Sequence, residues 1–292
     1  MANLAGVGTP ITYTEDNPIL NRIKEWRKKR WGQVREPQND AERVLIADWL
    51  GYRGRREAGP DGTVGAATHA YTHLEMDLQW RHLLSEHIAE ECSHGWSFVQ
   101  LADKIDPSKD HSKPDPAFVE KYGLGARNNH GAIIRRDFLS FIFAGNPWVY
   151  GHVTASVRLP GITTPEVVHY QRTSQLAGEE EHHYHMLQKI HDTVWELIDG
   201  YGEFAIRRRI AEIDEEALNN NSRTIWDPPT REFLVNQLGG SLEMAPLFPA
   251  WREYLYLNVL GWEPEPVTIK EWPAGVPLSM DSSSPTAVGE AR

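Results

Sequence analysis

Apolar side chains recur along most of this chain at the three- and four-residue spacing of an amphipathic helix, and the alternation typical of strands is scarce. The pattern predicts an all-α protein. In the first half of the chain the predicted helices cover residues 18–31, 39–58, 66–105 and, briefly, 117–122. In the second half they cover residues 132–159, 165–199, 203–219, 229–237 and 249–260.

Capping and turn residues mark several of these boundaries. Asn39 or Asp40 supplies an N-cap side chain for the second helix, and Thr164 followed by Pro165 is typical of an N-cap and a first helical residue. Residues 59–62, Gly-Pro-Asp-Gly, predict a turn. Residues 106–131 are rich in Asp, Lys, Pro, Gly and Asn and predict a long connection between two helical hairpins.

A long crossover between two hairpins is what a four-helix bundle needs when its second and third helices run parallel. We therefore expect a ferritin-like four-helix bundle over residues 39–199, with additional helices at both ends. Residues 1–38 would form an N-terminal arm and helix, and residues 200–262 would form C-terminal helices packed on the bundle. We expect residues 263–292 to form an extended, disordered tail, because the end of this segment is rich in Ser, Pro, Gly and Ala.

Composition excludes several classes of function. The formal net charge is −11, from 41 acidic and 30 basic residues, whereas nucleic-acid binding needs a concentrated basic surface. Two short basic runs, residues 27–30 and 207–209, are expected to be solvated helix faces. No apolar run approaches the roughly 20 residues of a membrane-spanning helix, and the N-terminus does not resemble a signal peptide. We expect a cytoplasmic protein without nucleic-acid or membrane partners.

Cysteine and histidine usage narrows the chemistry. Cys92 is the one cysteine, which excludes a disulfide framework and cysteine-rich zinc sites. Thirteen histidines is a high number for 292 residues, and several stand beside glutamates.

The first such motif is Glu91-Cys92-Ser93-His94, in which Glu and His three residues apart share one helix face. At about 100° per residue, Glu91 and His94 fall on an apolar stripe, whereas Glu90 falls on a polar stripe and is expected to face water. The apolar stripe also contains Trp80, Leu84, His87, Phe98 and Leu101. A lone carboxylate buried there would cost several kcal/mol unless it were paired or bound a metal, so we interpret Glu91 and His94 as ligands.

The second motif lies within residues 178–185, where three registers compete. Glu180 and His183 share an apolar stripe with Leu176, Leu187, Val194 and Ile198. Glu179 with His182 lies on a mixed stripe, and Glu181 lies on a polar one. The burial argument therefore favours Glu180 and His183.

One Glu-x-x-His copy alone most often means a solvated face or a salt bridge. Two copies on apolar stripes, on the second helix of each hairpin, match the arrangement of a carboxylate-bridged dimetal site.

Such a site also needs one carboxylate from the first helix of each hairpin. In the first hairpin the candidate is Glu57, and Glu42 is its rival because both lie on partly apolar stripes. In the second hairpin the expected acid is missing, because residues 138–165 contain no Asp or Glu. His152 or Asp137 would substitute, although His152 could equally be a core histidine bonded to a carbonyl group.

At these residues the chain resembles the ferritin-like dimetal oxygenases, and most closely the catalytic subunit of the phenylacetyl-CoA epoxidase family. The likeness covers residues 39–199. It depends on the segment 90–95, Glu-Glu-Cys-Ser-His-Gly, on the segment 179–183, Glu-Glu-Glu-His-His, and on Arg56-Glu57. The third-helix acid of that family aligns near Tyr150 or His152, where this sequence departs from the pattern.

The resemblance implies a di-iron site, with manganese as the alternative metal for carboxylate and imidazole ligands. Glu91 and Glu180 would bridge the ions. One iron would be held by Glu57, Glu91 and His94, and the other by Glu180, His183 and His152. His87, one turn before Glu91, would be a neighbour of the ligands or an extra ligand.

The implied activity is a monooxygenase reaction that uses O2 to oxidise a small organic substrate. Trp148, Tyr150 and Phe141 would line its pocket, unless they are plain core. The chain has no Gly-x-Gly-x-x-Gly motif and no cysteine cluster, so electrons would come from a separate reductase, and we expect a homo- or hetero-oligomer. The main alternative is a metal-free or single-metal subunit that supports a catalytic partner. A zinc hydrolase using His182, His183 and His185 lacks the His-Glu-x-x-His pattern.

Overall fold

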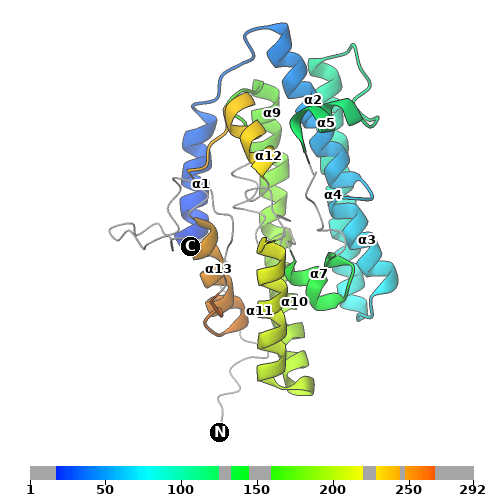
Figure 1. The fold of residues 1–292 in the computed structure, drawn as a ribbon, viewed down its shortest axis with the longest axis vertical. Coiled ribbons are helices and arrows are strands. Elements are labelled where there is room, and N and C mark those ends of the chain that lie inside the picture. The colour runs from blue at the N-terminus through cyan, green and yellow to red at the C-terminus, as the bar shows by residue number, and fades with distance from the viewer. Residues whose placement is uncertain (1–17, 125–132, 145–158, 220–227, 244–246, 267–292) are drawn as a thin grey trace, which may run out of the picture.

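The computed structural model describes residues 18–124, 133–144, 159–219, 228–243 and 247–266, without the side chains of residues 18–20, 176–184, 218, 228 and 247–249 (Figure 1). Within these ranges the chain is helical, and an isolated bridge between Arg35 and Ile162 is the one β-type pairing. The predicted all-α class is confirmed for the described residues. No described helix is long and apolar enough to cross a membrane.

The first part of the chain forms a helical hairpin with additions. Its elements are α1 (Pro18–Trp31), α2 (Asp40–Ala58), α3 (Thr63–His73), α4 (Leu78–Ile105) and α5 (Pro116–Tyr122). Helix α2 begins where the sequence predicts, because the Asn39 side chain accepts a hydrogen bond from the Glu42 amide. Helix α2 packs along α4, and α3 packs on the other end of α4.

The second part is built around one long helical run. Its elements are α7 (Phe138–Phe143), α9 (Pro165–Tyr170), the π-helical segment η1 (Gln171–Gln175), α10 (Leu176–Tyr201) and α11 (Glu203–Asn219). They are followed by α12 (Pro228–Glu232), η2 (Phe233–Gln237), α13 (Leu247–Leu255) and η3 (Tyr256–Leu260). Helix α11 contacts α10 and α7, and η3 contacts α10.

Two predicted helices are interrupted. The single helix expected over residues 66–105 is wrong, because the chain leaves helical geometry between α3 and α4. There Asp77 caps α4 by accepting a hydrogen bond from the Trp80 amide at 2.8 Å. A continuous helix from residue 132 is also wrong, because Asp137 caps α7 in the same way. Acidic N-caps inside otherwise periodic stretches caused both errors.

Helix α4 runs antiparallel to the continuous helical run of α9, η1 and α10, and two contacts fix their register (Figure 1). Near the start of α4, the Trp80 indole donates a hydrogen bond to the Thr193 hydroxyl of α10 at 2.8 Å. Further along α4, the Phe98 ring meets the ring of Tyr170, the last residue of α9, edge-on with centroids 5.4 Å apart. The residues of α4 between these two contacts therefore lie at the level of η1 and the first part of α10.

Helices α2 and α4 touch backbone to backbone at a pair of glycines. A Cβ atom at Gly54 would lie 2.4 Å from the Gly95 carbonyl oxygen, and one at Gly95 would lie 2.6 Å from the Gly54 carbonyl oxygen. No side chain fits between them. This close approach brings the end of α2 next to the middle of α4, where Glu57 and His94 stand.

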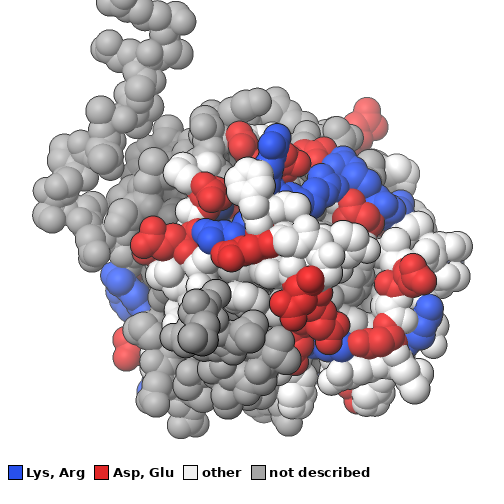
Figure 2. Space-filling view, turned by 90° about the horizontal axis from the view of Figure 1, so that it is seen from below, with Lys and Arg blue, Asp and Glu red and all other residues white. Residues whose placement is uncertain are grey.

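One position of the first basic run is less solvated than expected. Arg27 is 2% exposed, so the interpretation of residues 27–30 as a solvated face is wrong at that position. On α11, Arg207 pairs with Glu203 at 3.0 Å and Arg208 pairs with Glu212 at 2.9 Å. Figure 2 shows acidic and basic side chains lying close together on the face seen from below.

Candidate metal site

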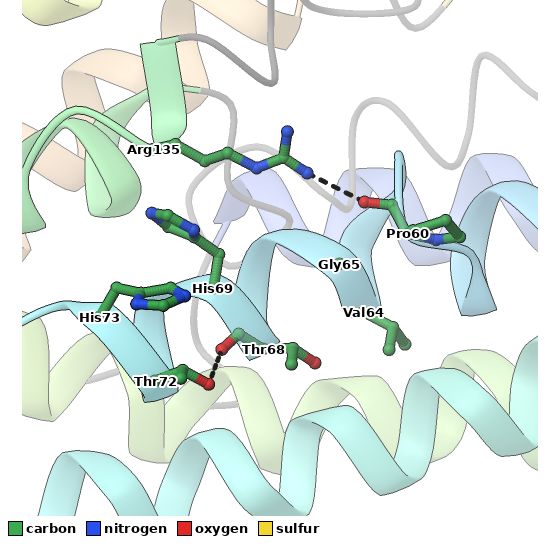
Figure 3. Close-up of a pocket in the computed structure, with 8 residues that line it drawn as sticks. All are labelled: Pro60, Val64, Gly65, Thr68, His69, Thr72, His73 and Arg135. Carbon is green, nitrogen blue, oxygen red and sulfur yellow. Dashed lines mark hydrogen bonds between the residues drawn. The ribbon is translucent and has the colours of Figure 1, made fainter.

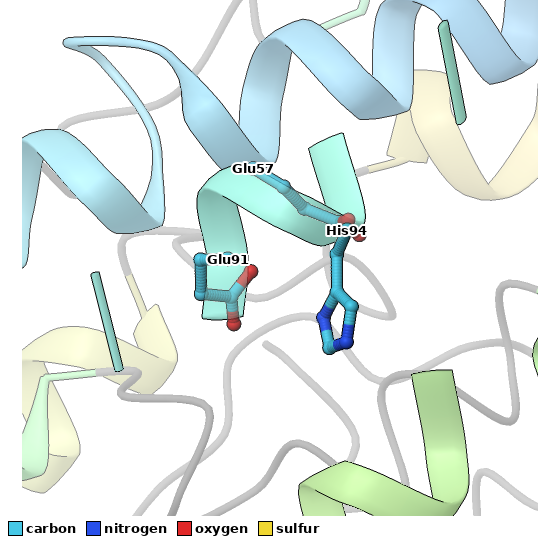
Figure 4. A group of neighbouring side chains, drawn as sticks. All are labelled: Glu57, Glu91 and His94. Carbon is cyan, nitrogen blue, oxygen red and sulfur yellow. The ribbon is translucent and has the colours of Figure 1, made fainter. Parts of the chain in front are cut away.

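Three of the predicted ligands meet between α2 and α4. Glu57 from α2 and Glu91 and His94 from α4 each offer one ligand atom, and these atoms lie within 4.8 Å of one another (Figure 4). The residues are 9%, 7% and 6% exposed, respectively. The site therefore unites a pair that sequence spacing puts on one helix face with a carboxylate from a separate helix.

The predicted core-facing stripe of α4 explains the burial of two of these residues. Trp80, Leu84, His87 and Phe98 are buried together with Glu91 and His94. On the opposite face Glu86, Ser93 and Gln100 are exposed. The expected orientation of Glu91 and His94 toward the core is confirmed.

Glu90 does not face water as expected. Its side chain is only 23% exposed, and its Oε1 lies 3.8 Å from His94 Nε2. Glu90 is adjacent in sequence to Glu91 of the buried stripe, and its long side chain extends along the helix toward His94, which lies one turn further along. Burial raises the pKa of Glu90 above its usual range.

Arg53 holds one oxygen of Glu57. Its Nη2 donates a hydrogen bond to Glu57 Oε1 at 2.9 Å, and its guanidinium lies over the Phe98 ring at 4.4 Å. Glu57 Oε2 is buried and has no hydrogen-bond partner among the described residues. The arginine therefore fixes the carboxylate through one oxygen and leaves the other oxygen for a ligand.

The environment favours neutral His94. Burial lowers the pKa of His94 from the usual 6.5, the negative charge of Glu57 acts in the opposite direction, and the positive charge of Arg53 lowers the pKa further. A neutral imidazole keeps the lone pair that binds a metal. His94 is therefore ready to act as a ligand at neutral pH.

His87 lies one turn before Glu91 on the same buried face. Its Nε2 is 4.0 Å from Glu91 Oε1, and the residue is 2% exposed. It lies outside the group of three close ligand atoms. This position suits a neighbour that orients the Glu91 carboxylate.

Glu42, the rival of Glu57, has a different role. Both of its carboxylate oxygens accept hydrogen bonds from Arg35 at 2.7 Å, and one also accepts from the Gln38 amide. The Arg35 hydrogen bond is the largest cause that lowers the pKa of Glu42 to about 2. Glu42 therefore belongs to the start of α2, and Glu57 is the carboxylate near Glu91.

The second predicted half of the site is described less fully. Asp137 caps α7 through the Ser140 amide and pairs with Arg209 at 2.7 Å, and it does not belong to the clustered group. His152 lies outside the described residues, and Glu180 and His183 stand in α10 with side chains outside them. Their roles as ligands stay predictions.

A feature that the sequence did not indicate precedes the second motif. The helical run widens into a π-helical turn at Gln171–Gln175, a form that occurs often at functional sites. Gln171 and Gln175 are each 2% exposed, and Gln175 Oε1 is buried with no hydrogen-bond partner among the described residues. Nothing in the local sequence distinguishes this turn from an ordinary α-helix.

The described donors fit a divalent metal ion. Two carboxylates and a neutral imidazole form a set that suits iron or manganese. Arg53 pairs with Glu57 Oε1, and taking carboxylates such as those of Glu57 and Glu91 out of water is costly unless their charges are compensated. A bound cation would add to that compensation, and Glu57 Oε2 is an oxygen that it would engage.

None of the known protein families, curated proteins or solved structures compared with this chain matches it. Its function is therefore inferred from its own residues and their geometry.

Proposed function

We propose that this protein is a non-haem di-iron oxygenase built on a ferritin-like bundle, which oxidises a small organic substrate with O2 and external electrons. The observation that carries the proposal is the buried group of Glu57, Glu91 and His94, where α2 meets α4. This group contains the first-helix carboxylate and the complete first Glu-x-x-His motif of such a site.

The register of α10 supports a second half-site. Glu91 stands between two contacts that α4 makes with the continuous run of α9, η1 and α10: Trp80 with Thr193 of α10, and Phe98 with Tyr170 of α9. Because each helix rises about 1.5 Å per residue, positions 177–182 of α10 lie at its level. This stretch includes Glu180, and His183 is the next position along α10. We propose these two residues, with His152, as the ligands of the second ion.

The residues of the chain would have distinct tasks at the first ion. Glu57 would bind through Oε2 while Arg53 keeps Oε1, His94 would bind as a neutral imidazole, and Glu91 would bridge toward the second ion. Buried Leu84 and Phe98, on the same face of α4, would help to exclude water. When bound, the two irons would provide the redox chemistry that uses O2.

The electrons would come from a separate protein. The sequence contains no dinucleotide-binding glycine motif, and its single cysteine cannot hold an iron–sulfur cluster. An acidic chain with a net charge of −11 would attract a reductase through a basic docking surface.

A second candidate function is a single-metal or metal-free subunit that supports a catalytic partner. The observation that favours it is the absence of any Asp or Glu from residues 138–165, where the fourth carboxylate is expected. In that case one metal, or none, would bind, and Glu180 would have no effect on metal content.

Oxygen consumption tests the proposed reaction. The protein is loaded anaerobically with ferrous iron, mixed with dithionite-reduced methyl viologen, freed of excess reductant and exposed to O2. We expect the loaded chain to consume O2 at least about tenfold faster than Glu91→Gln, because this substitution removes a ligand charge from the site.

Glu86→Gln is the matched control, because Glu86 is an exposed glutamate of the same helix. It should consume O2 at the wild-type rate. Equal consumption by wild type and Glu91→Gln would contradict the proposal.

A further inference from the structure

A groove on α3, separate from the metal ligands, has a mainly apolar surface and contains three side chains with N–H donors, those of His69, His73 and Arg135. Its volume is about 540 Å3. It lies along one side of α3 and is crossed by Arg135, which precedes α7 (Figure 3). The lining residues are Pro60, Val64, Gly65, Thr68, His69, Thr72, His73 and Arg135.

The charge of this lining is opposite to that of the whole chain. Arg135 is permanently positive, His69 and His73 gain a positive charge on protonation, and the lining contains no Asp or Glu. The chain as a whole carries a net charge of −11. The groove is therefore a local site at which an anion would meet cationic groups.

The geometry brings these groups to the same space. His69 and His73 stand one turn apart on α3, with ring centroids 4.8 Å apart, and both rings lie on the side of α3 that Arg135 crosses (Figure 3). Arg135 Nη2 donates a hydrogen bond to the Pro60 carbonyl oxygen at 3.0 Å, which holds the guanidinium across the groove. The other guanidinium N–H groups are donors for a ligand.

An oxyanion fits this set of donors better than a metal cation. Two histidines four residues apart on a helix can chelate a transition metal, but the permanent charge of Arg135 in the same groove would repel it. Each imidazole carries an N–H donor whether it is neutral or protonated, so all three side chains of the groove offer a donor to an anion. A phosphate group can present a different oxygen to each of the three donors, and it carries more negative charge than a carboxylate.

We propose that the groove formed by His69, His73 and Arg135 binds a phosphate group, either as the free ion or as a monoester on a larger molecule. Thr72 is not a donor in this arrangement, because its hydroxyl donates to the Thr68 carbonyl oxygen at 2.7 Å. The open volume beyond the three donors would hold the organic part of a monoester. The proposal is independent of the metal site, so either can fail without the other.

The test is an NMR titration of the metal-free full chain that follows the imidazole Cε1–H signals of His69 and His73. The two signals are assigned with His69→Gln and His73→Gln. Inorganic phosphate and phenyl phosphate are added in separate titrations at constant ionic strength and pH. We expect saturable shifts of both signals, with Arg135→Gln weakening the affinity at least about tenfold, the equivalent of losing a charge-assisted hydrogen bond.

Arg208→Gln is the matched control, because it removes the same charge from an exposed position on α11. It should leave the affinity unchanged. Tighter binding of phenyl phosphate than of phosphate would identify a monoester as the ligand, and equal binding would identify the free ion. The proposal is overturned if neither compound shifts the two signals, if Arg208→Gln weakens binding as much as Arg135→Gln, or if zinc ions shift the signals while both phosphates do not.

Discussion

Among the individual residues, Glu57 is distinctive because the protein binds one of its carboxylate oxygens, while the other is buried with no hydrogen-bond partner among the described residues. Arg53 donates a hydrogen bond to Glu57 Oε1, and its guanidinium packs over the Phe98 ring. Sequence reasoning found Glu57 but could not separate it from Glu42, since both lie on partly apolar stripes. The signal that was overlooked is the four-residue spacing of Arg53 and Glu57 on one helix face.

Replacing Arg53 should leave a buried carboxylate without its charged partner. We expect Arg53→Met to lower the unfolding free energy of the metal-free protein by about 3 kcal/mol, because breaking a buried ion pair exposes the full cost of the remaining charge. Urea denaturation measures this change. Arg43→Met, which removes an exposed pair with Asp40, should cost less than about 1 kcal/mol. Similar losses in both variants would show that the Arg53–Glu57 pair has no special role.

The titration of His94 tests the electrostatic effects of Glu57 and Arg53. In the metal-free protein, the NMR signal of the His94 imidazole should titrate below the usual pKa of 6.5. Glu57→Gln should lower the pKa further, because the charge of Glu57 favours the imidazolium, and Arg53→Met should raise it. NMR titration of wild type and both variants checks the two opposite shifts. Shifts in the reverse directions would contradict the described geometry.

The lowered pKa of His94 also determines how the stability of the folded protein changes with pH. Below about pH 6.5 an unfolded chain protonates His94 while the folded chain resists it, so the unfolded state binds more protons. The contribution of His94 to stability is therefore complete above that pH and is lost as the pH falls. A smaller acid destabilisation in His94→Gln than in wild type, measured by urea denaturation between pH 7 and pH 5, is the expected result. An equal acid destabilisation in both proteins would contradict it.

Among the helices, capping residues predicted the starts well, and periodicity alone predicted continuity poorly. Asn39 and Thr164 stand as N-caps where they are expected. Asp77 interrupts a stretch whose apolar spacing is continuous, so the break before α4 was missed. The π-helical turn at Gln171–Gln175 was also missed, because an α-helix and a π-helical turn share nearly the same apolar pattern.

The crossing of α2 and α4 depends on two small residues. A methyl group at Gly54 would collide with the Gly95 carbonyl oxygen, a backbone atom that cannot rotate away. We expect Gly54→Ala to separate the helices, to lower the unfolding free energy by about 1–3 kcal/mol and to weaken metal binding. Urea denaturation and metal titration measure the two effects.

Gly200→Ala is the control for this prediction. Gly200 lies in α10, and a methyl group added there would meet no atom within 4 Å, so alanine should be neutral or stabilise by up to about 1 kcal/mol. Loss of stability in Gly54→Ala without loss of metal affinity would mean that the crossing does not position the ligands.

For the molecule as a whole, the helical class follows from periodicity, and the arrangement of the helices follows from contacts that periodicity does not reveal. The Trp80–Thr193 hydrogen bond joins α4 to α10 over a sequence separation that no local pattern indicates. One site for the two Glu-x-x-His motifs requires such a pairing of α4 with α10. The side chains of Glu180 and His183 lie outside the described residues, so the shared site stays a prediction.

The most direct measurement is the number of ferrous ions bound per chain under anaerobic conditions, in wild type, Glu91→Gln, Glu180→Gln and the control Glu86→Gln. We expect about two ions in wild type and in the control, and fewer in each of the other two variants, because each substitution would remove a ligand from a shared site. One ion that is unaffected by Glu180→Gln would favour the single-metal subunit. A wild-type chain that binds no iron would overturn the proposed di-iron site.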